Sequence, residues 1–431
     1  MKNFSIDTRS LKKGDYFVAI KGVTFNGHNF IDEAIRKGAS GVIIDKQHEN
    51  VSVPSHIKKI ITPNTGEFLA EKAASIIKKR KIKLVGVTGS VGKTSTKTAI
   101  KTLISPFYKV SESIGNFNTL LGISLSILNS VETDPDIFVT EIGTYGRGNI
   151  QRICNFFPPD YAVVTNVYPV HLERMKTISN IQLAKQELVQ AINKDGVAIL
   201  NYDDNLVRQM SNQCDGKTIF YSEKNTNIEV NPSIISAEIS LVGNHKWKIL
   251  LPAVAVALSM NIPIMKIEAH VPSVKNDRGR LNIIPGKKES VIIDDTYNAS
   301  QPSMEVALNL LLERKCRRRI AILGDMLELG SLEETAHAEI LDQAIQIGDI
   351  IILIGERFAR IASKKQQENL YLFSDVYDAK ENIHAVFTPS FGDCILLKGS
   401  ASIRLEKIAE DLIDSSISAK NTLVRQEKRW K

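Results

Sequence analysis

A short loop of small residues, followed directly by a lysine and a threonine, is the clearest chemical feature of this sequence. It reads Thr88-Gly89-Ser90-Val91-Gly92-Lys93-Thr94-Ser95 and lies between an apolar run, residues 82–87, and a segment that can continue as a helix. Backbone N–H groups of such a loop bind phosphate oxygens, the lysine places a charge between the outer phosphates, and the threonine hydroxyl can ligate Mg²⁺. Val87 stands where the usual pattern has its first glycine. The alternative is a plain Gly/Ser turn, but the flanking strand and helix favour a site for ATP or a relative.

Three further polar residues follow predicted strands in the same part of the chain. Glu141 follows residues 136–140, His171 follows a strand that ends near residue 165, and Lys185 lies on the next predicted helix. Ligands of open α/β sheets bind at the carboxyl ends of the strands, where a carboxylate can ligate Mg²⁺ directly or through water. Taken singly, these residues also have ordinary interpretations as a cap, a loop histidine and a solvated helix lysine.

The elements that must position these residues suggest an α/β protein of three domains, because 431 residues exceed what one hydrophobic core usually serves. We predict that the three domains comprise residues 1–81, 82–284 and 285–431. The predicted strands are 16–20, 41–44, 84–87, 137–140, 161–165, 197–200, 290–293, 319–323, 350–354 and 394–397, with a further β-rich patch at 220–242. The predicted helices are 30–37, 67–79, 95–104, 181–192, 249–260, 303–313, 334–347 and 402–413. This alternation implies mostly parallel sheets covered by helices. The third domain has a dinucleotide-fold pattern but no G-x-G-x-x-G, so no nicotinamide site is inferred.

Composition and charge narrow the class of protein. Hydrophobic residues make up 43% of the chain and charged residues 24%, as in ordinary soluble proteins. The net charge of +7 is spread along the chain without a nucleic-acid motif, which favours an enzyme acting on anionic substrates. The one local basic run, residues 420–431, is predicted to be a solvated tail. Two prolines and an asparagine interrupt the longest apolar stretch, 249–264, which favours a buried helix over a membrane span.

The four cysteines, Cys154, Cys214, Cys316 and Cys394, lie far apart and form no C-x-x-C pair. Disulfides and a zinc site are therefore not expected, and the reducing cytoplasm is the predicted location. The first residues lack the apolar core of a signal peptide.

Taken in order, these motifs resemble those of the Mur ligase family, whose members form amide bonds in peptidoglycan precursors. The resemblance covers nearly the whole chain and includes, after the phosphate loop, Gly115-Asn116-Phe117-Asn118-Thr119, Glu141-Ile142-Gly143, Asn166, His171 and Lys185. Asp7-Thr8-Arg9-Ser10 and residues 25–30 look like the family's uridine-nucleotide domain. In the last domain, residues 294–300, residues 323–330 followed by His337, and Leu397-Lys398-Gly399-Ser400 are similar to the branch that adds D-alanyl-D-alanine.

The resemblance implies a small N-terminal α/β domain that binds the uridine nucleotide, a central P-loop-type ATPase domain with a parallel sheet, and a C-terminal Rossmann-like α/β domain. The implied activity joins D-alanyl-D-alanine to UDP-N-acetylmuramoyl-tripeptide through an acyl phosphate, with ATP cleaved to ADP. Nucleic acid and membranes are not expected partners, and a monomer is expected.

Residue roles also follow from the resemblance. The implied catalytic residues are Lys93, Glu141, His171, Lys185 and Arg280. Two Mg²⁺ ions are expected, held by Thr94, Glu141, His171 and Lys185, and the lysine is expected to carry a CO₂ adduct, which requires a desolvated neutral amine. The nucleotide is expected to contact the phosphate loop, His245, Asp295, Tyr297 and Asn298. The other substrates are expected to contact Thr8, Arg9, Asn116, Asn118, Thr119 and Lys398.

Two segments depart from the family pattern. Residues 243–249 keep the histidine near the adenine but lack two expected asparagines, and Lys398-Gly399-Ser400 is followed by Ala401 instead of arginine, although Arg404 could supply the cation. Two alternatives stay open: a Mur-like ligase acting on another carboxylate, and a nucleotide-binding homologue without catalysis. The motifs of the last domain argue against the first. Joint retention of the phosphate-loop lysine, the carboxylate, the histidine and Lys185 argues against the second.

Overall fold

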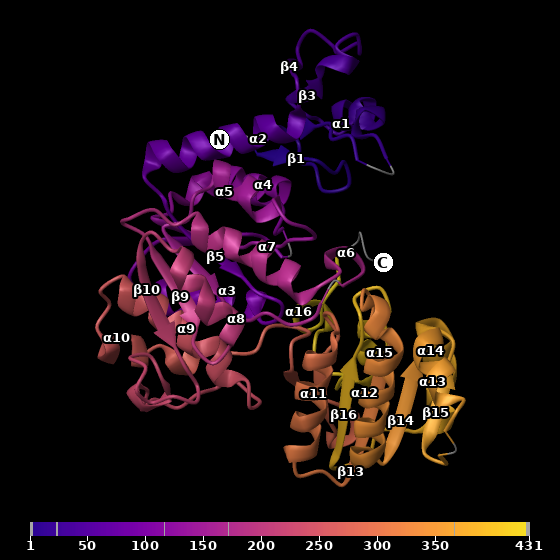
Figure 1. Cartoon of the computed structure of the whole chain (residues 1–431). Helices are drawn as coiled ribbons and strands as arrows, with labels where there is room; N and C mark the ends of the chain where they lie inside the picture. The colour runs from indigo at the N-terminus through magenta and orange to yellow at the C-terminus, as the bar shows by residue number, and fades with distance from the viewer. Residues whose placement is uncertain (1–2, 23–24, 116, 171, 366, 428–431) are drawn as a thin grey trace.

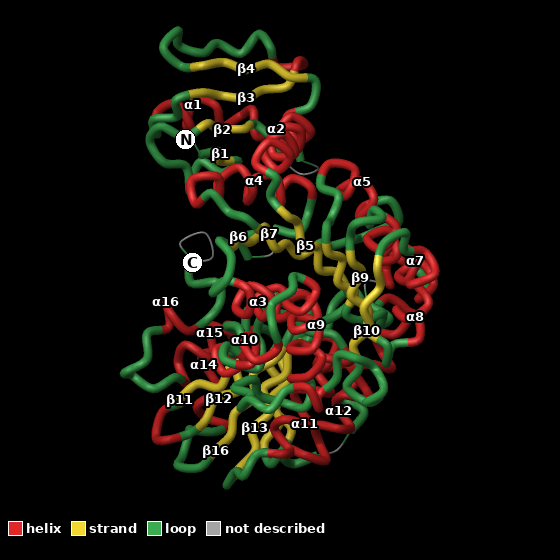
Figure 2. The backbone as a smooth tube through the Cα atoms, turned by 90° about the vertical axis from the view of Figure 1, so that its left-hand side faces the viewer, coloured by secondary structure: helices red, strands yellow, loops and turns green. Residues whose placement is uncertain are grey.

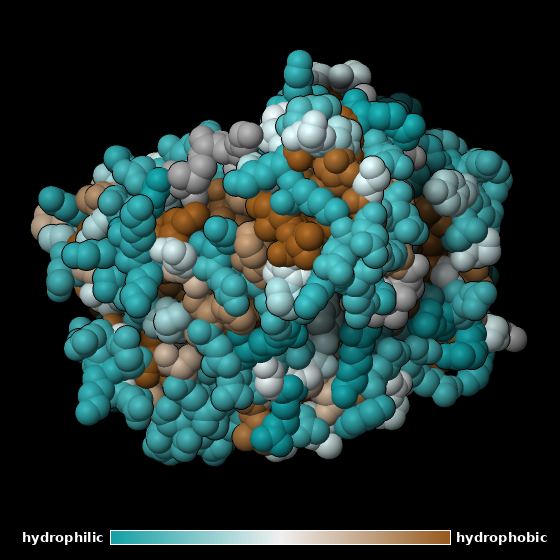
Figure 3. Space-filling model, turned by 90° about the horizontal axis from the view of Figure 1, so that it is seen from above, coloured by the Kyte–Doolittle hydropathy of each residue, from teal (hydrophilic) through white to brown (hydrophobic). Residues whose placement is uncertain are grey.

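The computed structural model describes residues 3–22, 25–115, 117–170, 172–365 and 367–427, and it contains three α/β units that follow one another along the chain (Figure 1). Each unit has its own sheet, with helices packed on the sheet faces. None of the described helices is long and apolar enough to cross a membrane. Polar side chains dominate the face seen from above, and apolar ones gather near its middle (Figure 3).

The first unit is a small parallel sheet with strand order β1-β2-β3-β4. Its strands are β1 (Phe4–Ser5), β2 (Tyr16–Val18), β3 (Gly41–Asp45) and β4 (Lys58–Thr62), and its helices are α1 (Ile31–Arg36) and α2 (Thr65–Arg80). The Asn64 side chain caps α2 by accepting hydrogen bonds from the N–H groups of Gly66 and Glu67. Helix α2 leads directly into the second unit.

The central unit is an all-parallel sheet with order β10-β9-β8-β5-β7-β6. Its strands are β5 (Lys83–Thr88), β6 (Val110–Glu112), β7 (Ile137–Glu141), β8 (Tyr161–Val164), β9 (Val197–Asn201) and β10 (Lys217–Tyr221). Its helices are α3 (Lys93–Ile104), α4 (Leu120–Ser130), α5 (Asn149–Phe156), α6 (Leu172–Met175), α7 (Ile178–Gln190), α8 (Asn205–Arg208), α9 (Lys246–Ser259) and α10 (Ile264–Glu268). Because β5 pairs with both β7 and β8, the ends of these three strands meet at one edge of the sheet.

The third unit has the order β11-β12-β16-β13-β14-β15, in which only β11 is antiparallel to its neighbour. Its strands are β11 (Asn282–Pro285), β12 (Val291–Asp295), β13 (Arg318–Gly324), β14 (Ile350–Ile354), β15 (Leu370–Phe373) and β16 (Asp393–Lys398). Its helices are α11 (Gln301–Glu313), α12 (Glu333–Ile347), α13 (Glu356–Ala362), α14 (Val376–Val386), α15 (Glu406–Leu412) and α16 (Ala419–Thr422). Strand β11 begins three residues before the predicted boundary at 285.

The first two units share a hydrophobic core. One cluster of buried side chains includes Val18 and Ile43 from the first sheet, Leu69 from α2, Leu84 from β5 and Ile123 from α4. In the view turned by 90°, the first unit and α2 lie at one end of the molecule and the third unit lies at the other (Figure 2). The core of the third unit is made of its own helices and strands, apart from the half-buried Val242.

Two sequence predictions about strands and cysteines are wrong. Residues 222–242 contain no strand, because Ser222 and Asn231 accept hydrogen bonds from nearby N–H groups and so stabilise turns there. Cys316 and Cys394 form a disulfide, with Cα atoms 5.7 Å apart although 78 residues separate them in sequence. Pairing of β13 with β16 brings them together, and no spacing pattern reveals such a contact.

Candidate active site

The phosphate loop connects β5 to α3, and two glycines make its shape possible. Gly89 has a φ of +151°, and a Cβ atom there would lie 1.9 Å from Thr165 Oγ1. Gly92 has a φ of +83° and directly precedes the helix. Asn166 holds the loop, because its Oδ1 accepts hydrogen bonds from the N–H groups of Ser90 (3.1 Å) and Val91 (2.9 Å). The loop is thereby fixed at the carboxyl end of the sheet.

The two polar residues after the loop point to different partners. Lys93 Nζ donates to the carbonyl oxygens of Gly89 (2.9 Å) and Ser90 (3.2 Å) within the loop. Thr94 Oγ1 donates to Glu141 Oε2 at 2.6 Å, and Asn118 Nδ2 donates to Glu141 Oε1 at 2.9 Å. A lysine, a hydroxyl and a carboxylate therefore meet where the phosphates of a nucleotide would lie.

Electrostatics keep this carboxylate ionised. Burial alone would raise the pKa of Glu141, but attraction to Lys93 and the hydrogen bond from Thr94 outweigh it, so the pKa is lowered from its ordinary value. Burial also lowers the pKa of Lys93, which Glu141 partly offsets. The site can therefore present an anionic oxygen pair beside a cation.

Lys185 on α7 is buried, with 3% of its surface exposed. Burial, followed by repulsion from Lys93, holds its pKa well below the ordinary value, and the attraction of Glu141 does not compensate. An amine in this environment is neutral more readily than a surface lysine. The environment of Lys185 therefore favours the neutral amine that the expected CO₂ adduct requires.

Arg280 brings the third unit into the site. It lies in the connection just before β11, and its Nη2 donates to Thr94 Oγ1 at 2.7 Å. Its guanidinium also lies 4.0 Å from the ring centroid of Tyr297, which follows β12. A continuous chain of contacts therefore runs from the third unit through Thr94 to Glu141.

A second cluster surrounds the end of β12. Lys398 Nζ lies 2.6 Å from Asp295 Oδ2 and donates to the carbonyl oxygen of Asn298 at 3.0 Å. Burial lowers the pKa of His245 to about 4, and its Nδ1 is buried without a hydrogen-bond partner among the described residues. A neutral imidazole with a buried polar atom that has no partner among the described residues is suited to a polar ligand such as a base.

Other predicted site residues make different contacts. Thr8 and Arg9 are in the first unit, where the Thr8 carbonyl oxygen accepts a hydrogen bond from Lys37 and Arg9 pairs with Asp7. Thr119 Oγ1 accepts a hydrogen bond from Gly122 N–H at the start of α4. Ser95 lies in the first turn of α3 and Thr88, at the end of β5, is fully buried. Asn116 and His171 lie outside the described residues.

One residue beside the site was missed. The basic run 420–431 was predicted to be solvated, but within its described part Arg425 is buried, with 9% of its side chain exposed. It contacts Glu406 and the carbonyl oxygens of Thr296 and Tyr297. These partners are two main-chain oxygens and a carboxylate 19 positions away, so nothing in the local sequence indicates them.

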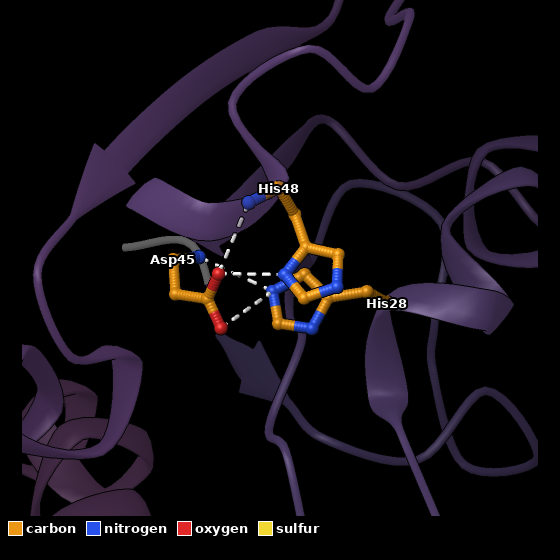
Figure 4. A group of neighbouring side chains, drawn as sticks. All are labelled: His28, Asp45 and His48. Carbon is orange, nitrogen blue, oxygen red and sulfur yellow. Dashed lines mark hydrogen bonds and ion pairs between the residues drawn. The ribbon is translucent and has the colours of Figure 1, made fainter.

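A cluster of two histidines and an aspartate lies in the first unit (Figure 4). The rings of His28 and His48 are stacked, with centroids 3.8 Å apart, and His48 Nδ1 lies 2.6 Å from Asp45 Oδ1. His28 Nε2 accepts a hydrogen bond from Asp45 N–H, and Asn26 contacts the remaining nitrogen of each ring. Hydrogen bonds thus occupy all four ring nitrogens, and parallel rings do not aim their lone pairs at one point. The cluster fixes loops of the first unit.

Family models match three stretches of the chain. A Mur ligase family catalytic domain matches residues 1–77, a Mur ligase middle domain matches 87–262, and a Mur ligase glutamate ligase domain matches 279–401. These three stretches correspond closely to the three sheets.

Relatives that match almost the whole chain belong to the same family as these models. UDP-N-acetylmuramoyl-tripeptide–D-alanyl-D-alanine ligase of Bacillus subtilis is 30% identical over 96% of this chain and 93% of its own length. The enzyme of the same name from Escherichia coli is 26% identical, covering 94% and 92%. Among solved structures, MurF of Thermotoga maritima in complex with ADP is similar with a TM-score of 0.78 and 26% identity, over 95% of this chain and 96% of that one. MurF of Acinetobacter baumannii is similar with a TM-score of 0.83 and 25% identity, covering 95% and 92%.

Proposed function

Since the chain belongs to the Mur ligase family, we propose that it joins D-alanyl-D-alanine to the terminal carboxylate of UDP-N-acetylmuramoyl-tripeptide, with ATP cleaved to ADP and phosphate. The observation that carries the proposal is the chain of contacts Arg280–Thr94–Glu141 at the phosphate loop. It supports phosphoryl transfer because Arg280 from the third unit meets Lys93 and Glu141 of the central unit at the phosphate loop. Relatives named for this reaction cover almost the whole chain.

The chemistry explains why ATP is needed. A carboxylate is a poor acylating agent, so the γ-phosphoryl group is first transferred to it, which gives an acyl phosphate and ADP. The amine of D-alanyl-D-alanine then attacks the acyl carbon, forms the amide and releases phosphate. Lys93 and Arg280 stabilise the negative charge of the transferring group, and the loop at Tyr297 covers the site against water.

The donor set fits Mg²⁺. A hydroxyl and a carboxylate oxygen 2.6 Å apart, Thr94 Oγ1 and Glu141 Oε2, are hard oxygen ligands of the kind that Mg²⁺ prefers. We propose that they hold one ion and that Lys185, as a carbamate, holds a second together with His171. The bound ions would supply positive charge around the phosphates. The carbamate forms when the neutral Nζ attacks the carbon of CO₂: an N–C bond forms, the electron pair of one C=O π bond moves to oxygen, and the nitrogen releases one proton.

The remaining assignments follow the same proposal. His245, Asp295, Tyr297 and Asn298 contact the nucleotide. Thr8, Arg9, Asn116, Asn118, Thr119 and Lys398 contact the precursor or the dipeptide. The enzyme works as a monomer in the cytoplasm, and light scattering of the purified protein tests the first of these statements.

One assay tests the proposed function. Purified protein is incubated with ATP, Mg²⁺ and UDP-N-acetylmuramoyl-tripeptide, with and without D-alanyl-D-alanine, and ADP and the product are measured. We expect ADP release that depends on the dipeptide and matches product formation. Turnover only with another carboxylate substrate would identify a different ligase. Nucleotide binding without ADP release under any condition would identify a non-catalytic homologue.

A further inference from the structure

The last described segment of the chain, which includes α16 and ends at residue 427, runs beside the connection between the central and third units. Arg278 Nη1 donates to the carbonyl oxygen of Lys420 at 3.4 Å, and a Cβ atom at Gly279 would lie 2.8 Å from Val424 Cγ1. Both ribbon views place α16 on the side of the third unit that faces the central unit (Figures 1 and 2). The segment therefore contacts the same connection that carries Arg280.

Arg425 attaches this segment to the loop after β12. Its Nη1 donates to the carbonyl oxygen of Thr296 at 3.1 Å and to Glu406 Oε2 at 3.0 Å, and its Nη2 donates to the carbonyl oxygen of Tyr297. Glu406 has only 1% of its side chain exposed. A planar guanidinium can hold these three acceptors at once, whereas an ammonium cannot match that geometry.

The loop held in this way carries the ring that contacts Arg280. Tyr297 N–H donates to the carbonyl oxygen of Gly279 at 3.0 Å, and its ring lies 4.0 Å from the Arg280 guanidinium. Arg280 in turn donates to Thr94. A displacement of the Tyr297 backbone would therefore move the ring that holds Arg280 against the phosphate loop.

We propose that Arg425 is a positioning residue for the ATP-dependent step: it fixes Thr296 and Tyr297 so that Tyr297 holds Arg280 beside Thr94. The proposal rests on the proposed function for the identity of the reaction, but ATP binding tests it separately. A purely structural contribution of the Arg425–Glu406 pair to the third unit is the competing explanation.

The chain offers a matched control for that explanation. Arg318 pairs with the fully buried Asp393 and donates to the carbonyl oxygen of Thr388, so it also links a buried carboxylate to main chain in the third unit. Asp393 begins β16, whereas Lys398 at the other end of that strand lies beside the nucleotide cluster. Arg318→Ala thus disturbs the fold of the third unit at the end remote from the site.

The experiment compares Arg425→Ala, Arg425→Lys and Arg318→Ala with the unmodified protein by thermal unfolding, ATP titration calorimetry and steady-state kinetics. We expect Arg425→Ala to raise the Kd and the KM for ATP about tenfold or more, as loss of a charge-assisted hydrogen bond does, with the KM for the tripeptide precursor unchanged. Millimolar ethylguanidinium should partly restore the ATP affinity of Arg425→Ala. The ATP affinity of Arg425→Lys should lie between those of Arg425→Ala and the unmodified protein. If Arg425→Ala does not fold, Arg425→Lys alone decides, by a selective rise in the KM for ATP.

Two results would overturn the proposal. The first is an unchanged ATP affinity in the Arg425 variants. A fall in ATP affinity no larger than that of Arg318→Ala, at the same loss of thermal stability, would count in the same way. The other is additivity of Arg425→Ala with Arg280→Ala in a double-mutant cycle on the Kd for ATP, because residues that act through one another are not additive. A protein that binds ATP but does not form the amide refutes the proposed function, while the binding cycle still decides the role of Arg425.

Discussion

Replacement of Arg280 by alanine tests the contact between the units most directly. The change removes the hydrogen bond from Nη2 to Thr94 and the stacking on Tyr297. A hydrogen bond from a charged group contributes about 1.5–3 kcal/mol, and a cation–π contact contributes about 0.5–2 kcal/mol. Loss of about 2–5 kcal/mol of transition-state stabilisation lowers kcat/KM for ATP about 30- to 5,000-fold. Arg280→Lys keeps the charge, so its kcat/KM for ATP should lie between those of Arg280→Ala and the unmodified protein.

The assay is ADP release at saturating precursor and dipeptide, measured against ATP concentration and pH. Burial raises the pKa of Glu141, and Lys93, Thr94 and then Arg280 lower it, so that the pKa lies below its ordinary value. Removal of Arg280 therefore raises that pKa, so the acidic limb of the pH–rate profile should move to higher pH. The precursor alone should still bind normally. A variant with kcat/KM within threefold of the unmodified enzyme, or with an unmoved acidic limb, would refute the reasoning.

Four other experiments are expected to have distinct outcomes. Lys93→Ala should lower turnover more than about 10³-fold, because a transition-state charge is lost, and retention of a tenth of the activity would contradict that role. Lys185→Ala should be nearly inactive and partly rescued by formate or acetate, whereas unchanged activity in this variant would exclude the carbamate. Since residues 243–249 lack two expected asparagines, competition kinetics should show looser discrimination between ATP and GTP than in a typical relative; strict ATP preference would count against this. Replacing Cys316 and Cys394 by serine should lower the free energy of unfolding by about 4 kcal/mol in the non-reduced protein, since the bond closes a long loop. Equal stability of the two proteins in denaturant titrations would argue against that bond.

The sequence predicts the parts of the site that depend on local pattern. The phosphate loop is recognisable because glycines, a lysine and a threonine must follow one another at fixed spacing between a strand and a helix. Glu141 could be located because strand ends meet at one edge of a parallel sheet, whereas the role expected of Lys185, on a helix, came from the family resemblance. Arg280 was found only through the family resemblance, since no local signal shows that this connection reaches Thr94.

The features that the sequence did not predict are long-range contacts. The Cys316–Cys394 bond depends on pairing of β13 with β16, and the buried position of Arg425 depends on main-chain oxygens of a distant loop. Residues 222–242 contain apolar side chains that suggested strands, but Val230 and Ile235 pack on the core around α9 as parts of a turn-rich segment. Their burial produced the apolar pattern without a sheet.

The core shared by the first two units determines where the chain can be divided without exposing apolar surface. Because α2 packs against α4 and contributes to a cluster that also includes β3 and β5, the predicted boundary near residue 81 does not separate two cooperative folding units. A fragment that ends there would leave the apolar side of α2 in water. The third unit instead has a core of its own, so dividing the chain before β11 disrupts fewer buried apolar contacts than dividing it near residue 81.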